Sequence, residues 1–221
     1  MSHCPLCIQP IDINSTLIFL DIDGVILEDR STPYFAYKIL KTFEEVFGGK
    51  VGISREYTAL EWRTVTARNL TEQPLDNLYR LIDRIQRVHR SARIVLSSAW
   101  RNNGTMQEIR DTMFATHEFS KLIIGKTPPA DGDHYAPEIQ TGQKFGPIAK
   151  EKYGLSLKSR AEQIDFWLRE HALQQVDFVI LDDEDDSLSH KFGDRFVHVD
   201  YLLSEQEINL ACKILHLELF G

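Results

Sequence analysis

The chain has 221 residues, of which 43% are hydrophobic and 26% are charged. This length and hydrophobic content suffice for one domain with a full core, and they exclude an intrinsically disordered chain. The formal net charge of −8 excludes a general electrostatic attraction to nucleic acid or to an anionic membrane, although a local basic groove is compatible with it.

The first predicted strand, over residues 16–21, leads into two carboxylates and a glycine turn. It reads Thr16-Leu-Ile-Phe-Leu-Asp21-Ile-Asp23-Gly24. Open α/β sheets bind their ligands at the carboxyl ends of the strands. Carboxylates two positions apart on a strand point to the same side, and they repel each other unless a cation or a shared proton intervenes. A divalent metal would resolve this repulsion, whereas a solvated turn with two acids is the alternative interpretation.

A helical insertion is predicted over residues 28–72. Residues 34–47 carry apolar side chains at helical spacing and are followed by a glycine pair, and a second helix is predicted over 55–69. A helix over 76–89 then returns the chain to a second strand that begins at Arg93. This is the order of a βαβ crossover with an insertion.

The second strand ends in two hydroxyl groups, those of Ser97 and Ser98. A helix is predicted over 102–117 and a third strand over 121–125. Residues 127–154 are rich in proline and glycine and predict a long irregular loop. Such a loop is either a site of substrate contact or a solvated excursion, and both interpretations stay open.

Basic residues open the next helix, and acidic residues close the strand that follows it. Lys158 and Arg160 stand at the start of an amphipathic helix, and a strand over 178–181 is followed directly by Asp182 and Asp183. The pattern therefore predicts a cation and an acidic pair near one edge of the sheet.

The two ends of the chain contribute less to the functional hypothesis. A strand over 195–199 and a helix over 204–219 are predicted to complete the sheet and to cover one face. Residues 1–15 are predicted to be an N-terminal extension, in which Cys4 and Cys7 have the spacing of a zinc half-site. A structural zinc needs four ligands, so we interpret these cysteines as ordinary thiols at a frayed terminus. Three cysteines do not make a disulfide scaffold, which favours a reducing compartment.

These fragments, in this order, resemble the four motifs of the haloacid dehalogenase (HAD) superfamily of phosphotransferases. The motifs are Asp-x-Asp after the first strand, Ser or Thr after the second, Lys or Arg near a helix start, and an acidic pair after a later strand. The resemblance spans roughly residues 16–200. It implies a Rossmann-like α/β domain over residues 16–221, with a mainly parallel central sheet flanked by helices. It also implies that the insertion over 28–72 is a small helical cap that selects substrates.

The resemblance implies a role for each acidic residue. Asp21 would be the nucleophile that forms an aspartyl phosphate, and Asp23 would be the general acid and base. Asp21 and Asp182 would bind Mg²⁺ together with the backbone carbonyl of Asp23. Asp183 would act in the outer shell of the metal, and Asp186 is the less preferred candidate for this role.

A hydroxyl group and a cation are expected to hold the remaining phosphoryl oxygens. Ser97 is preferred to Ser98 because it is the first residue beyond the apolar part of the strand. Arg160 is preferred to Lys158 because apolar residues at positions +4 and +7 place it at the inner end of a core helix. The superfamily usually has lysine here, and arginine would bind phosphate bidentately instead of as a point charge.

Two branches of the superfamily fit the chain. Ser97-Ser-Ala-Trp100-Arg101, with the helix that begins at Arg160 and the acidic pair, resembles a bacterial branch described as attached to RNA-repair proteins. That branch implies removal of phosphate from nucleic-acid ends. The chain is also similar to small-capped phosphatases that act on phosphotyrosine in proteins, including bacterial effectors delivered into host cells.

Between these substrates we expect a phosphoprotein, with phosphotyrosine preferred, because a small cap and an open entrance suit a protruding aryl phosphate. The aromatic residues of the predicted cap are Tyr34, Phe35, Tyr37, Tyr57 and Trp62. A nucleic-acid groove instead needs basic residues interleaved with aromatic residues. The nearest basic run is Arg80, Arg84, Arg87, Arg90 and Arg93, which has no aromatic ladder. A nucleic-acid end is the alternative, followed by a small metabolite and by a binding module without turnover.

The sequence also predicts a location. No stretch approaches the roughly 18 apolar residues of a membrane span, and the first residues lack a charged leader with a long apolar run. We therefore expect a soluble protein without a Sec-type signal peptide, either cytoplasmic or delivered into a host cell.

Overall fold

The computed structural model describes residues 11–12, 14–28, 33–48, 59–98, 105–128, 157–171, 173 and 175–217. Within these residues, five parallel strands form one sheet in the order β3-β2-β1-β4-β5. The strands are β1 Ser15–Leu20, β2 Ser91–Leu96, β3 Ile123–Lys126, β4 Asp177–Asp182 and β5 Phe196–His198. The predicted Rossmann-like α/β sheet is confirmed.

The strand order reverses beside β1. The chain adds β2 and then β3 on one side of β1, and it returns to add β4 and β5 on the other side. Leu20 of β1 pairs with Leu96 of β2 and with Leu181 of β4. The residues that follow these three leucines therefore emerge together at the carboxyl edge, at the switch point where open α/β sheets bind ligands.

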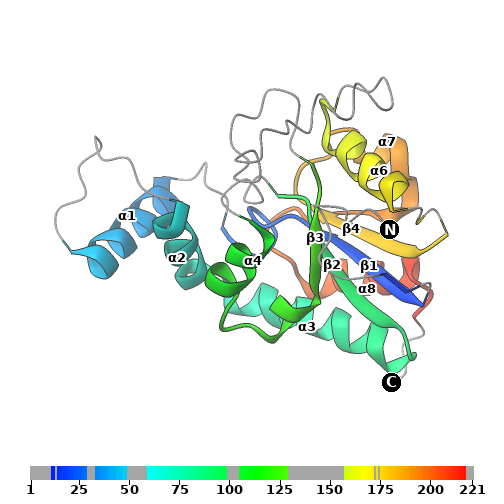
Figure 1. Cartoon of the computed structure of the whole chain (residues 1–221), viewed down its shortest axis with the longest axis horizontal. Helices are drawn as coiled ribbons and strands as arrows, with labels where there is room; N and C mark the ends of the chain where they lie inside the picture. The colour runs from blue at the N-terminus through cyan, green and yellow to red at the C-terminus, as the bar shows by residue number, and fades with distance from the viewer. Residues whose placement is uncertain are drawn as a thin grey trace.

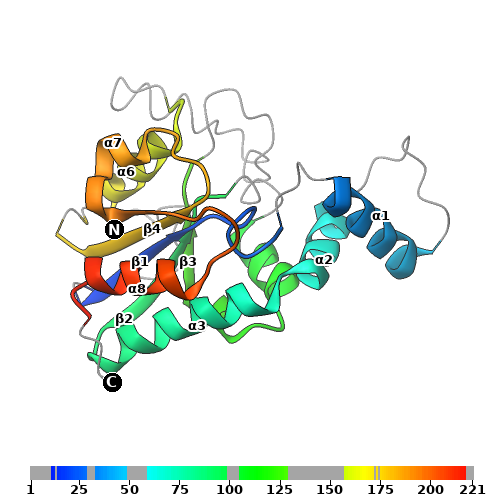
Figure 2. The same ribbon diagram turned by 180° about the vertical axis from the view of Figure 1, so that it is seen from behind.

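Helices cover both faces of the sheet (Figures 1 and 2). α3 and α8 pack on one face, and α6 and α7 pack on the other. These helices are α3 Glu72–Arg87, α6 Arg160–Glu170, α7 Leu188–Phe192 and α8 Glu205–Ile214.

The apolar side chains of the strands alternate between the two faces. On β1, Ile18 and Leu20 join the core beneath α3 and α8, whereas Leu17 and Phe19 join the core beneath α6. The indole ring of Trp167 from α6 meets the ring of Phe19 edge-on, with centroids 5.6 Å apart. A strand buried on both faces in this way reads as a continuous apolar run, which is why β1 could be predicted.

Two helices form an arm that projects from the sheet beside α4, as Figures 1 and 2 show from opposite sides. They are α1 (Pro33–Phe47) and α2 (Ala59–Asn69), and we call them the helical arm. Both were predicted, although α2 begins at residue 59 and residues 55–58 of the prediction lie outside the described residues. The chain returns from the arm where the amide of Thr71 donates to the carbonyl of Ile26, at 3.0 Å.

The segment after β2 differs from its prediction. One helix was expected over 102–117, but the described part holds a short α-helix, α4 (Met106–Glu108), followed by a π-helix, η2 (Ile109–Met113). The strand expected over 121–125 begins later, because Glu118–Leu122 form a 3₁₀ helix. The buried apolar side chains of this segment fall at α-helical spacing, which favoured one long helix, and that spacing does not distinguish the π-helical turn.

Two helices begin or end at other residues than predicted. α3 begins four residues before the predicted position 76, because Pro74 lies in the first turn, where its missing amide hydrogen costs nothing. It ends at Arg87 instead of residue 89, since His89 adopts a positive φ of 60°. The last helix was predicted over 204–219, but it ends at Ile214, and His216 takes a left-handed φ of 53° that terminates it.

Most of the predicted loop over 127–154, together with residues 1–10, lies outside the described residues. The short helix α7 and a 3₁₀ turn over Gly193–Arg195 were not predicted.

Candidate active site

The carboxyl edge of the sheet brings together residues that lie far apart in the sequence. Asp21 directly follows β1, Ser97 directly follows β2, and Asp182 is the last residue of β4. The ladder continues past the strands, because the amide of Asp21 donates to the carbonyl of Leu181 and the amide of Ser97 donates to that of Leu20, both at 3.0 Å. The three side chains therefore start from one level of the sheet.

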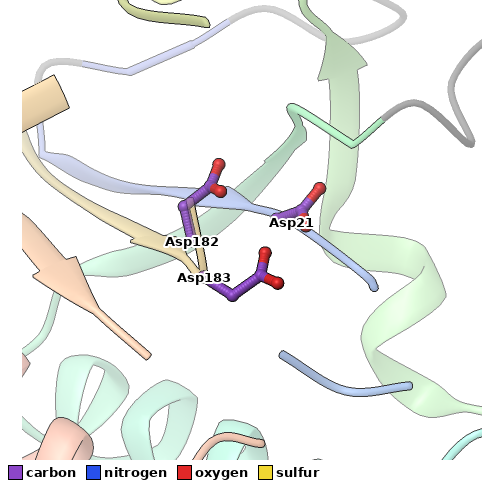
Figure 3. A group of neighbouring side chains, drawn as sticks. All are labelled: Asp21, Asp182 and Asp183. Carbon is purple, nitrogen blue, oxygen red and sulfur yellow. The ribbon is translucent and has the colours of Figure 1, made fainter. Parts of the chain in front are cut away.

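Three of the predicted acids form a group that we call the acid cluster: Asp21, Asp182 and Asp183. Each offers a carboxylate oxygen within 4.8 Å of the others. Figure 3 shows the three carboxylates gathered beyond the ends of β1 and β4. Asp21 and Asp182 are buried, and Asp183 is half-buried.

The acid cluster is electrostatically strained. Burial, and then the nearby charge of Asp21, raise the pKa of Asp182 well above its usual range. The same two causes, in the same order, raise the pKa of Asp183 to about 7. The backbone amide of Glu184 donates to Asp182 at 3.1 Å, which offsets only part of this penalty. Carboxylates in such a setting retain a proton or require a cation.

Arg160 supplies one cation. Its Nη1 lies 2.7 Å from Oδ1 of Asp21 and 2.9 Å from Oδ2 of Asp182. Burial alone would lower the pKa of Arg160, but the charges of these two carboxylates raise it above its usual value. The guanidinium contacts two of the three carboxylates of the acid cluster, and these four groups together carry two net negative charges when all are ionised. That excess matches the charge of one divalent cation.

The start of α6 decides which basic residue reaches the acids. Ser159 caps the helix by accepting from the amide of Glu162 at 3.2 Å, and the Glu162 carboxylate accepts from the amide of Ser159 at 3.0 Å. This cap makes Arg160 the first helical residue, and its backbone amide donates to the carboxylate of Asp186. Lys158 lies just outside the helix with an exposed side chain. The structure therefore brings Arg160 to the acid cluster.

The glycine of the first motif is needed for two reasons. Gly24 has a φ of +72°, and a Cβ at this position would collide with the carboxylate of Asp183. Its amide donates to the carbonyl of Leu27 at 2.7 Å, and its carbonyl accepts from the amide of Leu202 at 2.8 Å. Asp23 is half-buried in the same turn, and its carboxylate is not part of the acid cluster found among the described residues.

Hydroxyl groups and an unexpected cation line the same edge. Ser97 and Ser98 are fully buried. Lys126 ends β3, pairs with Leu96 and is 3% exposed, and the amide of Thr127 donates to Leu96 at 2.8 Å. Lys126 was not among the predicted site residues. A lysine that ends a short apolar strand was the signal that could have found it.

Several predicted contacts lie outside the described residues or side chains. Of the expected cap aromatics, the described side chain is that of Tyr37, which is 64% exposed on α1. Trp100 and Arg101 of the second motif, and Cys4 and Cys7 of the N-terminal extension, also lie outside the described residues.

Four arginines of the predicted basic run have polar or acidic partners, and the run extends past α3, since Arg90 follows this helix and Arg93 lies on β2. Arg84 donates to Oδ1 of Asn209 on α8 at 2.9 Å. Three further arginines form ion pairs, which are Arg80–Glu205 at 4.0 Å, Arg87–Asp83 at 2.7 Å and Arg90–Asp177 at 2.8 Å. The contacts of Arg80 and Arg84 tie α3 to α8, and Arg90 pairs with the first residue of β4.

The sequence matches one known protein family over most of its length. Residues 17–207 match the model of a family described as the HAD domain in Swiss Army Knife RNA repair proteins. The chain belongs to this family. The resemblance to the HAD superfamily is thereby confirmed, and the protein is a HAD-type phosphatase. Searches of curated proteins and of solved structures found no match.

The family also revises the expected substrate. It gives no support to a tyrosine phosphatase or to a bacterial effector, and the nucleic-acid alternative fits it better. HAD enzymes use a divalent metal, and the acid cluster fits one, because its donors are hard carboxylate oxygens whose mutual repulsion a cation would relieve. In the described part of the chain, no helix is long and apolar enough to cross a membrane.

Proposed function

We propose that this HAD domain is a Mg²⁺-dependent phosphatase that removes terminal phosphate groups from nucleic acid. The observation that carries the proposal is the acid cluster at the switch point of the sheet, in contact with the guanidinium of Arg160. The family's occurrence in RNA-repair proteins supports a nucleic-acid end over phosphotyrosine as the substrate.

Asp21 is the proposed nucleophile. It is buried at the end of the central strand, where its backbone is fixed by the ladder to β4. Its carboxylate oxygen attacks phosphorus as the bond to the leaving oxygen breaks, which yields an aspartyl phosphate and the free nucleic-acid hydroxyl. Water then attacks the same phosphorus, releasing inorganic phosphate and regenerating the carboxylate. Two moderate barriers replace one high barrier.

Asp23 is the proposed general acid and base. It lies two residues beyond Asp21, half-buried, with its carboxylate outside the acid cluster. A carboxyl group in this position can give a proton to the leaving oxygen and later accept one from the attacking water.

Arg160 and Ser97 are the proposed ligands of the phosphoryl oxygens. Arg160 already contacts Asp21, so it lies where a phosphoryl group must approach, and its planar fork suits two oxygens. Ser97 starts from the same level of the sheet on the neighbouring strand. Ser98 and Lys158 stay as alternatives for these two roles.

Asp21 and Asp182, together with the backbone carbonyl of Asp23, are the proposed Mg²⁺ ligands, with Asp183 in the outer shell. When bound, the cation neutralises the repulsion between the anionic nucleophile and the anionic phosphate. The two net negative charges of the acid cluster and Arg160 support this assignment.

A substrate panel under identical conditions tests the proposal. It compares RNA and DNA oligonucleotides phosphorylated at the 3′ or 5′ end with a phosphotyrosine peptide and a small aryl phosphate, each with Mg²⁺ or with a chelator. We expect the highest kcat/KM for a nucleic-acid end, and loss of all turnover on chelation. A higher kcat/KM for the phosphotyrosine peptide would contradict the substrate, and turnover in the presence of the chelator would contradict the metal.

A further inference from the structure

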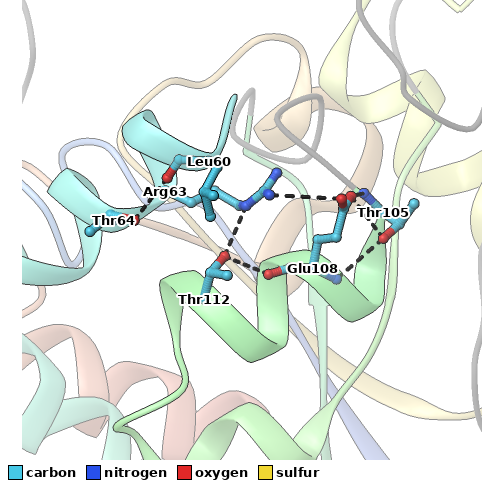
Figure 4. A network of polar contacts seen from close by, with 6 residues as sticks. All are labelled: Leu60, Arg63, Thr64, Thr105, Glu108 and Thr112. Atoms are coloured by element: carbon cyan, nitrogen blue, oxygen red, sulfur yellow. Dashed lines mark hydrogen bonds and ion pairs between the residues drawn. The ribbon is translucent and has the colours of Figure 1, made fainter. Parts of the chain in front are cut away.

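A buried arginine holds the helical arm against the core. Arg63 of α2 has a side chain that is only 6% exposed. Its Nε donates to Oγ1 of Thr112 at 2.8 Å, and its Nη2 lies 3.8 Å from Oε1 of Glu108 (Figure 4). Both partners belong to the α4–η2 segment. Since a buried guanidinium is costly without partners, these contacts favour one docked position of α2.

The partners of Arg63 form one preorganised unit. Oγ1 of Thr112 donates to the carbonyl of Glu108 at 2.6 Å. The Glu108 carboxylate accepts from the amide and from the hydroxyl of Thr105, at 2.8 and 3.0 Å. The amide of Thr105 is the largest of the causes that lower the pKa of Glu108, which is therefore ionised at neutral pH. Thr112 itself lies in the π-helix η2, a type of distortion that is frequent at functional sites.

The contacts of Arg63 connect two segments that both begin near the candidate active site. The arm is the segment that leaves the turn after β1, where Asp21 and Asp23 lie. The α4–η2 segment is the one that follows Ser97 at the end of β2. Arg63 therefore links the segment that follows β1 to the segment that follows β2. These two strands are neighbours in the sheet, and each carries motif residues at its carboxyl end. A substrate whose phosphate lies at Asp21 must extend its remaining part from this same edge.

We propose that Arg63 is a positioning residue that fixes the arm on the core and thereby sets the preference of the enzyme for large substrates. This inference rests on the proposed function and on the expectation that the insertion over 28–72, which contains the arm, is the cap that selects substrates. A polynucleotide extends past its terminal phosphate and meets the docked arm, whereas a small aryl phosphate ends within the site. A displaced arm therefore weakens binding of the polynucleotide selectively.

Arg63→Lys tests the proposal, because it keeps the charge but loses the Nε–H that contacts Thr112. We expect the KM for a terminally phosphorylated oligonucleotide to rise about 10-fold, the value of one good hydrogen bond, with kcat nearly unchanged. The KM for a small aryl phosphate should stay the same. Arg68→Lys is the matched control, since Arg68 is exposed on the same helix, and it should change neither constant.

A double-mutant cycle tests whether Arg63 acts through the α4–η2 segment. Thr112→Val removes the bridging hydroxyl, so the double variant Arg63→Lys/Thr112→Val should be no worse than the more affected single variant. Glu108→Gln keeps the capping geometry with Thr105 but loses the charge, and it should give a smaller effect of the same kind. Additive effects of Arg63→Lys and Thr112→Val would overturn the proposal.

Hydrogen exchange provides a readout that does not depend on turnover. In Arg63→Lys, the amides of α2 should exchange faster, while those of β1 and β4 keep their protection. Unchanged protection of α2, or an equal rise in KM for the oligonucleotide and the aryl phosphate, would overturn the inference. Failure of the proposed function is seen separately, because the wild-type protein would then not release phosphate from oligonucleotides at all.

Discussion

The two edges of the sheet hold the same kinds of charged residues in opposite proportions. At the amino edge, Asp177 at the start of β4 faces two arginines, with Arg90 at 2.8 Å and Arg195 at 3.7 Å. All three side chains are 34–40% exposed. At the carboxyl edge, the three carboxylates of the acid cluster face one guanidinium, and all but Asp183 are at least 86% buried.

This difference separates charges that stabilise the fold from charges that perform chemistry. Partly exposed ion pairs such as those of Asp177 contribute little free energy to folding. A buried group with excess negative charge raises the pKa values of its acids and binds a cation, which is typical of active sites. The comparison predicts that substitutions at the carboxyl edge change catalysis, whereas matched substitutions at the amino edge change stability slightly.

The largest effect is expected for Asp21→Asn. An amide is neither a nucleophile nor a good Mg²⁺ ligand, so turnover should fall about 10⁴-fold or more. The matched change at the amino edge, Asp177→Asn, should leave kcat/KM unchanged. Steady-state kinetics of both variants with one oligonucleotide measure this contrast, and comparable losses of activity would contradict it.

Asp23→Asn should depend on the leaving group. An alkyl oxygen of ribose needs a proton in the transition state, whereas an aryl oxygen with a conjugate pKa of about 10 leaves more easily. We expect hydrolysis of nucleotide ends to slow by roughly 10²–10⁴-fold, and formation of the phosphoenzyme from an aryl phosphate to slow much less. Rapid-quench experiments should show the phosphoenzyme accumulating in the variant. Equal slowing without accumulation would mean that Asp23 has only a structural role.

Arg160→Gln tests the excess negative charge of the acid cluster. It removes the cation between Asp21 and Asp182 and should lower the free energy of unfolding of the metal-free protein by about 3 kcal/mol. Because the guanidinium then no longer competes for the same oxygens, the variant should bind Mg²⁺ more tightly than the wild type. Urea denaturation and calorimetric titration measure the two effects. Lys158→Gln is the control, and an equal response from it would contradict the assignment of Arg160.

The acid cluster also predicts a pH dependence. The pKa of Asp183 rises from its ordinary 3.8 to about 7 on folding, chiefly through burial and then through the charge of Asp21. An acid with a raised folded-state pKa contributes stability below its unfolded pKa and loses that contribution as the pH rises through its folded pKa. The metal-free protein should therefore lose stability between about pH 4 and pH 7.

Mg²⁺ should reverse this loss, because it binds the ionised carboxylates. The increase in melting temperature caused by Mg²⁺ should be larger at pH 8 than at about pH 5. Melting curves with and without the metal at both pH values measure it, and an increase of the same size at both would refute the prediction.

The smallest effect is expected at the amino edge. Arg90→Gln removes a partly exposed ion pair with Asp177 and should cost about 1 kcal/mol or less of unfolding free energy. It should leave the Mg²⁺-induced stabilisation unchanged. A cost as large as that of Arg160→Gln would erase the distinction between the two edges.

Much of the site could be predicted because its residues are attached directly to strand ends. Asp21, Ser97 and Asp182 meet because parallel strands in register end at one level, and apolar runs identify such strands. The position of Arg160 could have been fixed more firmly from Ser159 and Glu162, since Ser-x-x-Glu is the pattern of a capping box.

The rest depended on tertiary contacts that local patterns do not encode. Arg63 and Thr112 are 49 positions apart, and they meet only because the arm docks on the core. The π-helix η2 keeps the apolar spacing that predicted one long helix, so its backbone form could not be read from that spacing. The amide of Leu202, which donates to the carbonyl of Gly24, belongs to the loop after β5, and no sequence pattern assigned this loop to the site.

The most direct test of the central claim is to locate the covalent intermediate. The wild-type protein is mixed with Mg²⁺ and an oligonucleotide that carries a radiolabelled terminal phosphate, quenched in acid within the first turnover, and mapped by peptide analysis. We expect an acid-stable, hydroxylamine-sensitive label on Asp21, formed at a rate at least equal to kcat. Label on Ser97 or another residue, or release of phosphate without any labelled protein, would contradict it.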